Sequence, residues 1–312
     1  MELENRLLRY FVTVAREGSM TRAAEELHVT QSNLSKQIKV LETQVGASLF
    51  RRSSCHLYLT ESGRILLQYA EDILTLADRA QQAMDQQSMD VVAGDVYIGC
   101  GESPHIRFLA QAIRDVRKEH PQVCCHLVSG DTQMLSEDLQ RGVLDFAVLW
   151  EAVDPRRYGF FPIPIADHYG VVMRKDDPLA RKEAVNVGDL VGKSLIGGRQ
   201  SIRVNYPAWF GAEMEHLQFA ATFSLNYNST LLVQAGLGYS LTFDGLSDTG
   251  EDSTLCFRPL SPPLVSYANV VWKLHHRLSP AAEAVRTAYL HHLQSVTQQS
   301  EESLFDEKRK KG

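Results

Sequence analysis

The chain has 312 residues, which is too long for a single compact module and suits two or three domains at roughly 100–200 residues each. Apolar residues make up 44% and charged residues 22%, close to the usual globular mixture, so a disordered or low-complexity chain is excluded. No run approaches the roughly 20 apolar residues of a membrane span, and acidic residues precede the first apolar stretch, so we expect neither membrane insertion nor secretion. The five cysteines are scattered and form no C-x-x-C pair, which is typical of the reducing cytoplasm.

The net charge of −6 argues against a nucleic-acid partner, but the charge is unevenly distributed. Residues 1–65 hold nine Lys and Arg and seven Asp and Glu, a net +2. The rest of the chain holds 23 basic and 31 acidic residues, a net −8. A mildly basic front therefore precedes an acidic body.

Residues 1–46 are expected to form three short helices. Apolar residues recur at helical spacing over residues 3–17, and the pattern returns over 20–27 and 31–45. Ser19 and Thr30 are suited to cap the second and third helices, and a glycine follows the first and the third, as at many helix ends.

The third helix carries short polar and basic side chains on its outward face. A helix-turn-helix needs a brace helix, a tight turn and a second helix whose polar amino-terminal end faces base edges. Residues 57–60 indicate the returning strand of a small wing, which would bring Arg52 to a phosphate or to the minor groove. From periodicity alone, an ordinary three-helix bundle with a solvated polar face explains this pattern equally well. The residues expected to contact DNA are Thr30, Gln31, Ser32, Ser35, Lys36, Lys39 and Arg52.

Residues 1–66 also carry a dense and ordered set of motifs. They are Leu8-Arg-Tyr-Phe-Val-Thr-Val-Ala-Arg-Glu-Gly-Ser, Thr21-Arg-Ala-Ala-Glu-Glu-Leu-His-Val-Thr-Gln-Ser, Leu34-Ser-Lys-Gln-Ile, Leu49-Phe50 and Leu59-Thr60-Glu-Ser-Gly63. This set resembles the DNA-binding end of LysR-type transcriptional regulators. The resemblance implies a partner of double-stranded DNA with a dyad-symmetric operator. Two departures stand out: Ser32 replaces a proline common after the glutamine, and Cys55-His56 replace the second basic residue of the wing.

A long helix is expected from a cap at Thr60 to about Met89. Its apolar residues repeat at spacings of four and three, which is a heptad seam that favours a partner helix. The alternative is that this seam packs on its own domain. The family resemblance favours an antiparallel pair of these helices, and with it a homodimer or homotetramer. The seam consists of Leu66, Ala70, Ile73, Ala77, Ala80 and Met84.

From residue 92 onward, short apolar strands alternate with helices, which predicts βα units and mostly parallel sheets. Strands are expected at residues 96–100, 123–128, 146–150, 169–173, 194–196, 223–225, 239–241 and 267–272. Helices are expected from Ser103-Pro104 to about 120, from a cap at Asp131 to about 141, near 201, over 228–236 and from 280 to about 296. Residues 301–312 have the composition of a solvated tail.

This body contains Gly94-Asp95-Val-Tyr-Ile-Gly, Gly142-Val-Leu-Asp145-Phe-Ala and Val233-Gln-Ala-Gly236-Leu-Gly238. These motifs are similar to the effector-binding part of the same family, whose two α/β lobes resemble periplasmic binding proteins. The resemblance implies an α+β multidomain protein: a winged helix-turn-helix over residues 1–60, a linker and dimerisation helix over 61–91 and a two-lobed α/β effector domain over 92–300. Lobe I would comprise about 92–162 and 267–300, and lobe II about 163–266.

In such sheets, ligands lie beyond the carboxyl ends of the strands, where helix N-termini favour anions. The expected effector contacts are the hydroxyls of Ser103, Thr132, Ser201 and Thr230 and the guanidinium groups of Arg199 and Arg203. Each hydroxyl could equally be a helix cap, and each arginine a surface charge. A small anionic effector is favoured, although a neutral metabolite fits the same fold.

Two functional hypotheses follow. The first is a cytoplasmic, ligand-responsive transcriptional regulator without catalytic function or cofactor, for which a contact with RNA polymerase is open. The second is an enzyme or solute-binding module that uses its front end only for assembly, but no nucleophile–base motif supports it. Cys124 and Cys125 point to opposite sides of a strand, so no metal site is expected there. Cys55 on the wing is the one thiol whose oxidation could affect DNA binding, and a redox role for it is open.

Overall fold

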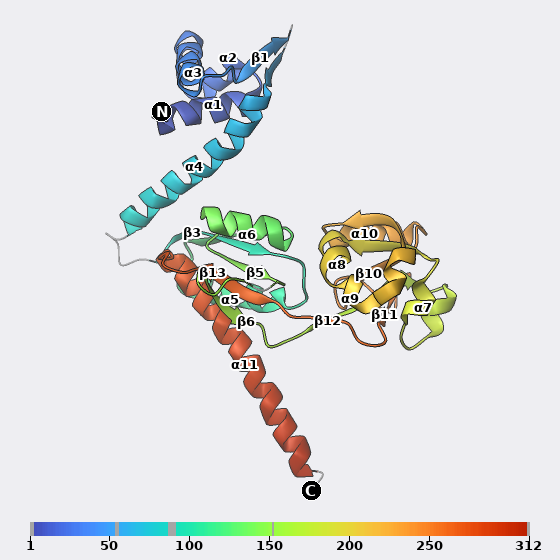
Figure 1. Ribbon diagram of the computed structural model, residues 1–312. Helices are drawn as coiled ribbons and strands as arrows, with labels where there is room; N and C mark the ends of the chain where they lie inside the picture. The colour runs from blue at the N-terminus through green and yellow to red at the C-terminus, as the bar shows by residue number, and fades with distance from the viewer. Residues whose placement is uncertain (1–2, 54–55, 87–91, 152, 311–312) are drawn as a thin grey trace. The chain divides into compact units, whose positions relative to one another are not determined.

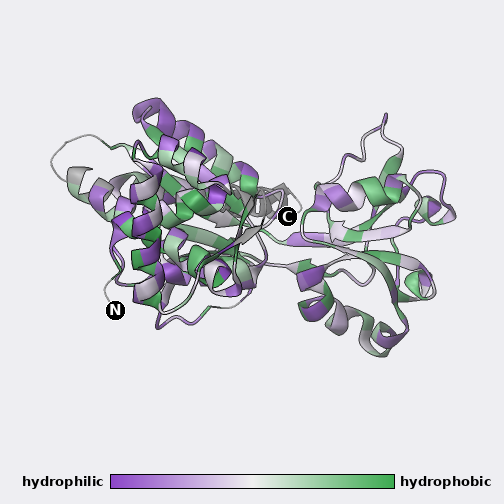
Figure 2. Cartoon of the chain, turned by 90° about the horizontal axis from the view of Figure 1, so that it is seen from above, coloured by the Kyte–Doolittle hydropathy of each residue, from purple (hydrophilic) through white to green (hydrophobic). Residues whose placement is uncertain are grey.

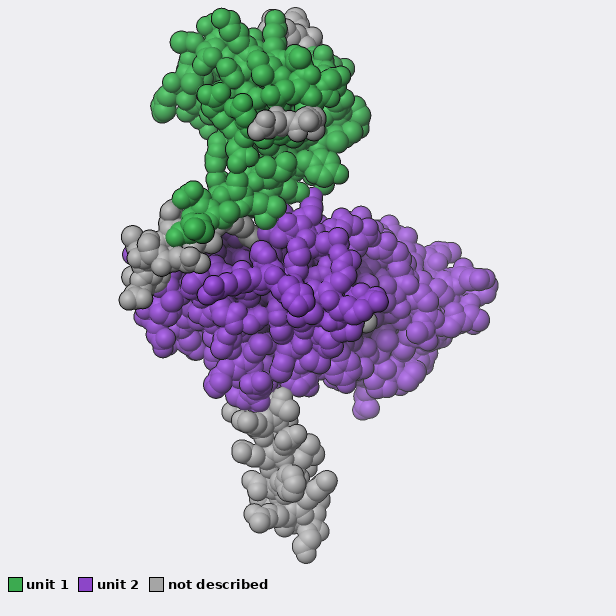
Figure 3. Space-filling model, turned by 60° about the vertical axis from the view of Figure 1, so that its left-hand side comes forward, with its two compact units in different colours: residues 1–90 green, residues 91–312 purple. Residues whose placement is uncertain are grey.

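The computed structural model describes residues 3–53, 56–86, 92–151 and 153–310, and the chain divides into two compact units, residues 1–90 and 91–312 (Figures 1 and 3). Each unit has its own apolar core. Within the described residues, no helix combines the length and the apolar character that crossing a membrane requires.

The first unit begins with three helices whose ends follow local sequence signals: α1 (Asn5–Glu17), α2 (Met20–Glu26) and α3 (Gln31–Val45). Ser19 and Thr30 accept hydrogen bonds from backbone N–H groups in the first turns of α2 and α3, as expected of N-caps. Gly18 and Gly46 have φ of 60° and 70°, a left-handed conformation that ends α1 and α3 at little steric cost. The predicted three-helix order is confirmed.

A two-stranded wing and a long helix complete this unit. Strands β1 (Phe50–Ser53) and β2 (His56–Leu59) pair antiparallel, and helix α4 (Glu61–Gln86) follows directly. The Oγ1 of Thr60 accepts the N–H of Gly63 at 3.0 Å, so the predicted cap is present. Gly63 is needed here because a Cβ would lie 2.2 Å from the carbonyl oxygen of Leu49. The predicted continuation to Met89 lies outside the described residues.

The two sides of α4 have different surroundings, which corrects the predicted seam. Ala70 is fully buried and Leu66 is partly buried against the core of the first unit, because the first half of α4 packs on α1. These two positions are therefore not available to another helix. The exposed apolar side chains form a row that shares only Ile73 and Met84 with the predicted seam and is spaced by four, four, three and eight residues. It consists of Ile65, Tyr69, Ile73, Leu76 and Met84, and we call it the α4 stripe.

The second unit contains two sheets, and the first has the strand order β4-β3-β5-β13-β6. Its strands are β3 (Gly94–Cys100), β4 (Val123–Ser129), β5 (Phe146–Leu149), β6 (Tyr158–Pro162) and β13 (Asn269–Lys273). Strands β4, β3 and β5 are parallel, and β13 is antiparallel to both of its neighbours. Helices α5 (Ile106–Glu119) and α11 (Pro280–Lys310) cover one face, and α6 (Thr132–Arg141) covers the other (Figure 1).

The second sheet has the order β11-β7-β10-β8-β9, with β12 paired to β7. Its strands are β7 (Asp167–Arg174), β8 (Ser194–Gly198), β9 (Gln218–Phe223), β10 (Tyr239–Phe243), β11 (Leu255–Pro259) and β12 (Val265–Ser266). Helices α7 (Val187–Leu190), α8 (Arg199–Val204) and α9 (Tyr206–Phe210) lie on one face and α10 (Asn226–Gln234) on the other. The strands of both sheets are largely apolar, whereas the helices carry both apolar and polar residues (Figure 2).

We call the body around the first sheet lobe I and the body around the second sheet lobe II. The chain passes from lobe I to lobe II between β6 and β7, and it returns between β12 and β13. The predicted α/β architecture is confirmed, but four local predictions are wrong. The sixth strand, expected at 223–225, is β9 at 218–223, helix α5 starts at Ile106 rather than Ser103, and β6 and β11 are not predicted. Helix α11 also runs past residue 296 through most of the expected tail to Lys310.

Candidate DNA-binding face and ligand cleft

Helix α3 presents a polar face because its other face is fixed in the core of the first unit. Leu34, Ile38 and Leu41 are buried at 3% exposure or less, which sets the rotation of the helix. The side chains of Gln31, Ser32, Lys36 and Lys39 consequently point to solvent, and Thr30 is exposed at the helix start. Ser35 is half-buried at the border of this face.

Several details of this face were not foreseen. Asn33 is exposed on the first turn of α3 beside Gln31 and Ser32, and its amide is a further group that can read a base edge. The side chain of Thr30 is engaged in capping, since its Oγ1 accepts the N–H of Asn33 at 3.3 Å. Arg52 lies on β1, but its side chain is outside what the structure describes. Asn33 precedes Lys36 by three residues, and this helical spacing alone places both side chains on the same face.

Glu42 is an acidic residue of α3 whose carboxylate binds the backbone just before and at the start of the wing and does not belong to the exposed polar face. Its Oε1 accepts the N–H of Leu49 at 2.7 Å and that of Phe50 at 3.4 Å, so the carboxylate fixes the entry of the wing. The exposed amino-terminal part of α3 therefore carries lysines and amides without a competing carboxylate among its described residues.

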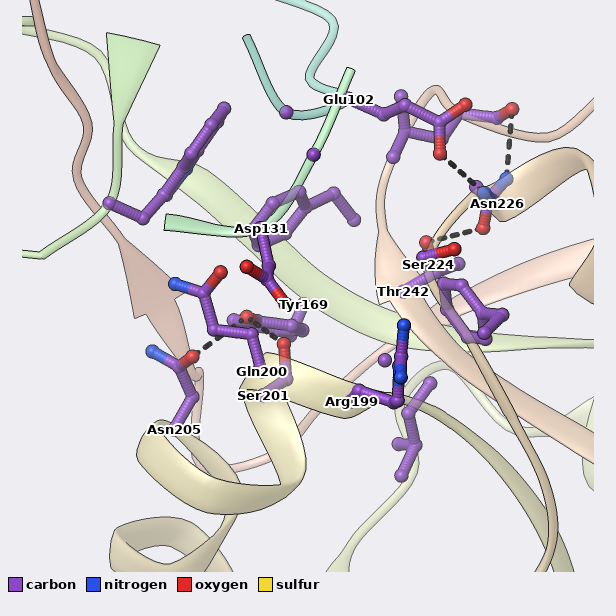
Figure 4. Close-up of a pocket in the computed structure, with 18 residues that line it drawn as sticks. Glu102, Asp131, Tyr169, Arg199, Gln200, Ser201, Asn205, Ser224, Asn226 and Thr242 are labelled. Atoms are coloured by element: carbon purple, nitrogen blue, oxygen red, sulfur yellow. Dashed lines mark hydrogen bonds between the residues drawn. The ribbon is translucent and has the colours of Figure 1, made fainter. Parts of the chain in front are cut away.

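The second unit has a cavity of about 120 Å³ between lobe I and lobe II (Figure 4). A single water needs roughly 10–15 Å³, so this cavity admits a molecule of about ten non-hydrogen atoms. Its walls come from the carboxyl ends of β3, β4 and β5 in lobe I and of β8, β9 and β10 in lobe II. This is the position at which ligands bind in open α/β sheets. Aromatic rings of Trp150, Tyr169, Phe223 and Phe243 form much of the wall.

The cleft has fewer cationic groups available to pair with an anionic ligand than the sequence suggests. Arg199 lines the cavity and is exposed. Asp131 caps α6 by accepting the N–H of Met134 at 3.0 Å, and Glu102 accepts the backbone N–H of Asn226 at the start of α10. The N-termini of α6 and α10, two of those expected to attract an anion, thus already hold carboxylates of the chain itself, whereas the N-terminus of α8 has no side-chain cap.

The side chain of Gln200 joins the two lobes at one end of the cleft. Its Nε2 donates to Thr132 Oγ1 at 2.9 Å and to Glu151 Oε1 at 3.1 Å, and its Oε1 accepts the N–H of Thr132 at 3.0 Å. Gln200 belongs to α8 in lobe II, whereas both partners belong to lobe I. We call this set of three hydrogen bonds the Gln200 clasp. Gln200 and Asp131 also line a second, more polar hollow of about 390 Å³ that includes Arg203.

A buried carboxyl group lies where the chain enters lobe II. Asp167, 3% exposed, accepts hydrogen bonds from Ser103 Oγ at 2.6 Å and from Trp150 Nε1 at 2.9 Å. His105 Nε2 is 3.4 Å from the same carboxyl. Burial raises the pKa of Asp167 above its ordinary value of 3.8, while the hydrogen bonds from Ser103 and Trp150 and the nearby His105 and His168 oppose the rise. This cluster holds the indole that forms one wall of the cleft.

The structure separates the six expected effector contacts into three groups. Ser201 and Arg199 line the cavity, and Ser201 Oγ also lies 2.8 Å from the hydroxyl of Tyr169. Thr132 and Arg203 line the neighbouring polar hollow instead. Ser103 and Thr230 are buried in internal networks: Ser103 bonds Asp167, and Thr230 Oγ1 lies 3.0 Å from Ser247 Oγ. Both hydroxyls thus have hydrogen-bond partners within the protein, and neither residue is among those that line the cavity.

Sequence reasoning also missed several cavity-lining groups. Tyr169 donates its hydroxyl to Asn205 Oδ1 at 3.2 Å, and Asn205 lines the cavity from the end of α8. Trp150 and Phe243 stack with ring centroids 6.2 Å apart and join the walls of the two lobes. An aromatic residue at a strand end looks like an ordinary core residue in the sequence, so only the meeting of two sheets reveals these groups.

A winged helix-turn-helix joined to a two-lobed α/β domain with a ligand-sized cleft defines a DNA-binding regulator that responds to a small molecule. The profile of "Bacterial regulatory helix-turn-helix protein, lysR family" matches residues 5–64, and that of "LysR substrate binding domain" matches residues 90–294. The chain belongs to the LysR family of transcriptional regulators.

Relatives match along nearly the whole chain. The HTH-type transcriptional regulator CfxR of Cupriavidus necator is 31% identical over 294 residues, 92% of this chain and 91% of its own. The Hca operon transcriptional activator HcaR of Escherichia coli is 30% identical over 305 residues, 95% of this chain and all of its own. The crystal structure of the LysR family regulator CbnR shares the fold with a TM-score of 0.72 at 18% identity, covering 94% of this chain and 99% of that one. Both relatives are named as transcriptional regulators, which agrees with the predicted class.

Replacing Asp167 by Asn tests the buried carboxyl group through the pH dependence of stability. A folded-state pKa above 3.8 means that the native protein holds more protons than the unfolded chain in the window above pH 3.8, so the contribution of Asp167 to stability falls as the pH rises through that window. Asn carries no charge, and the stability of Asp167→Asn relative to the parent should therefore increase from pH 4 upward and then level off. Urea unfolding followed by tryptophan fluorescence measures this difference; a difference that is flat or that declines with pH contradicts the assignment.

Proposed function

We propose that the exposed end of α3 reads an operator and that the cleft between the lobes binds the effector that controls it. The observation that carries the first half is the exposure of Gln31, Ser32 and Lys36 on a helix whose opposite side is fully buried. Amide side chains form paired hydrogen bonds with adenine, and lysines grip phosphates or guanine in the major groove. Because its partner is DNA, we propose that the protein acts in the cytoplasm. A contact with RNA polymerase stays a prediction.

The two kinds of side chain on α3 have different tasks in this proposal. Gln31, Ser32 and Ser35 stand at the amino-terminal end, which enters the major groove in helix-turn-helix proteins, so they read bases. Lys36 and Lys39 lie further along and neutralise phosphates, which supplies affinity without sequence information. Thr30 supports the set by fixing the first turn, and Arg52 on the wing is proposed to contact the backbone as well.

We further propose a dyad-symmetric assembly in which the α4 stripe packs against the same stripe of a second copy. The stripe leaves Tyr69 58% exposed and Met84 64% exposed in a single chain, although both sit in a regular helical row of apolar residues. Such a row is unfavourable in water and is satisfied by an equivalent row related by a twofold axis. A twofold pair of α3 helices would then match a dyad-symmetric operator. Whether two such pairs form a tetramer is a separate prediction from the sequence.

For the effector, we propose a small, partly planar molecule with hydrogen-bonding groups at both ends. The aromatic wall around Trp150 and Phe243 suits a planar apolar body, and the hydroxyl and amide groups of Ser201 and Asn205 suit a polar end. Arg199 can pair with one carboxylate, whereas Glu102 and Asp131 disfavour a second negative charge. This argues for a neutral or zwitterionic compound in place of the simple anion predicted from the sequence.

Exchanging single residues on α3 separates base reading from phosphate binding. The full-length protein is first used to select duplexes from a random pool, and we expect a motif with dyad symmetry. Gln31→Ala should then weaken binding to the selected duplex roughly 5–150-fold and broaden the motif at one position per half-site. Lys39→Ala should weaken all duplexes alike and reduce the slope of log K against log salt by about one per protomer. Lys118→Ala, exposed on α5, is the control; a pool without any enriched motif refutes the proposal.

A charged substitution in the α4 stripe tests the assembly. Tyr69→Glu places a carboxylate in the proposed contact, and because the side chain is 58% exposed in one chain, the fold should persist. We expect the mass from sedimentation equilibrium to fall by half. Met134→Glu, an exposed apolar residue on α6, is the matched control and should leave the mass unchanged. Equal masses for Tyr69→Glu and the parent rule out the stripe as an interface.

Removing the Gln200 clasp tests whether it holds the lobes together. Gln200→Ala leaves the N–H of Thr132 without its acceptor, and one hydrogen bond contributes about 1 kcal/mol. Hydrogen–deuterium exchange at residues 131–135 should therefore quicken on the order of fivefold. Gln133→Ala is the control because Gln133 is exposed and its side chain bonds Glu137 within the same helix. Unchanged exchange in Gln200→Ala would falsify the role of the clasp.

A further inference from the structure

Three side chains on the outer edge of lobe I offer different metal-ligand atoms to one point. Among the described residues, a carboxylate oxygen of Asp95, the Sγ of Cys124 and a ring nitrogen of His126 all lie within 4.8 Å of one another. We propose that these residues bind a divalent transition-metal ion of the zinc class, at a site separate from the effector cleft.

The register of two neighbouring strands creates this cluster. Strands β3 and β4 are parallel, with Asp95 opposite Cys124 and Tyr97 opposite His126. Side chains two residues apart point to the same face of a strand, so Cys124 and His126 share a face with Asp95 and Tyr97. This face is covered by α6 further along the strands, where Tyr97 packs, whereas Cys124 is exposed at the sheet edge. An ion can reach the cluster directly from solvent.

The distances in the cluster are close to those of a bound ion. Zinc lies about 2.0–2.2 Å from nitrogen and oxygen ligands and about 2.3 Å from sulfur, so tetrahedral ligand atoms are roughly 3.3–3.7 Å apart. The His126 Nε2 already lies 3.0 Å from Asp95 Oδ1. The imidazole is held by stacking on the ring of Tyr97, with centroids 4.6 Å apart and planes inclined by 19°. The Cys124 Sγ lies within 4.8 Å of both other ligand atoms, on an exposed side chain.

The charges and the ligand types also favour such an ion. On binding, the Cys124 thiol releases its proton to solvent, so a thiolate, a carboxylate and a neutral imidazole together bring two negative charges to the dication. A thiolate with an imidazole selects zinc, cobalt, nickel or copper over magnesium and calcium, which prefer oxygen ligands. Three protein ligands leave a fourth position to water, the arrangement of an open zinc site.

The position of the cluster separates it from the cleft. Asp95 and Cys124 are each the second residue of their strand, whereas the cleft is formed at the opposite, carboxyl ends by Gly101 and Gly130. The ion would therefore be a second ligand and not the cleft effector. In the sequence Cys124 stands beside Cys125, whereas Asp95 is 29 residues away and joins the cluster only through strand pairing.

Cobalt(II) is the probe that tests the site in the full-length, chelator-treated protein. We expect one equivalent of Co²⁺ to produce a near-ultraviolet thiolate charge-transfer band together with intense visible bands of four-coordinate cobalt, and Zn²⁺ to displace it. Cys124→Ser should abolish the charge-transfer band, and His126→Ala should weaken Co²⁺ binding at least tenfold. All three ligands are at least partly exposed, so the variants should fold, and circular dichroism verifies this.

Cys125→Ser is the matched control because Cys125 lies on the opposite face and packs against the core. Cys125→Ser should retain the full cobalt spectrum. A charge-transfer band that survives Cys124→Ser, that is lost in Cys125→Ser, or that never forms in the parent protein overturns the proposal.

Discussion

The buried Asp167 carboxyl group is the constraint on which the cleft depends. It is the first residue of β7 in lobe II, yet its hydrogen-bond donors Ser103 and Trp150 belong to lobe I. A carboxyl group that is 3% exposed cannot lose these donors without a large desolvation cost, so the hydrogen bonds oppose separation of the lobes at this junction. The same hydrogen bond fixes the Trp150 indole. The fixed indole in turn requires glycine at position 101, because a Cβ there would lie 2.8 Å from Cζ3 of that ring. One buried group therefore sets both the junction and a wall of the ligand cavity.

The electrostatics of the cleft follow from how the chain satisfies its own helix ends. Free helix N-termini attract anions, and this general rule underlies the expectation of an anionic effector. In the folded protein, Asp131 and Glu102 occupy the ends of α6 and α10, and the Gln200 amide occupies the N–H of Thr132. The rule holds, but here side chains of the protein itself already accept hydrogen bonds from the N–H groups of these helix ends. Of these three, only the Asp131 cap is encoded locally, whereas Glu102 and Gln200 act across the gap between lobes.

This contrast explains how much of the structure could be predicted from the sequence. Helices α1 to α3 were predicted nearly to the residue because Ser19, Thr30 and the two glycines act within one turn. The α/β architecture and Ser201 and Arg199 at the cavity also follow from alternating patterns and strand ends. The buried role of Ser103, the burial of Ala70 and the joining of Asp95 to His126 depend on segments far apart in the chain, and a periodic pattern contains no information about which segment will lie opposite.

Helix α4 shows how one element can couple assembly to DNA recognition in the proposed regulator. Its inner residues, including the buried Ala70, pack on α1, and α1 in turn packs on α3, so the recognition face and the α4 stripe belong to one closely packed body. Packed cores of this kind move as rigid units, so the angle at which two stripes meet determines the separation and orientation of two α3 helices. An effector needs only to favour one of two such angles to change operator affinity, and the free energy available is the difference in its affinity for the two arrangements. The packing that removes Leu66 and Ala70 from the predicted seam thus places the proposed α4 interface and the DNA-binding face in one rigid unit.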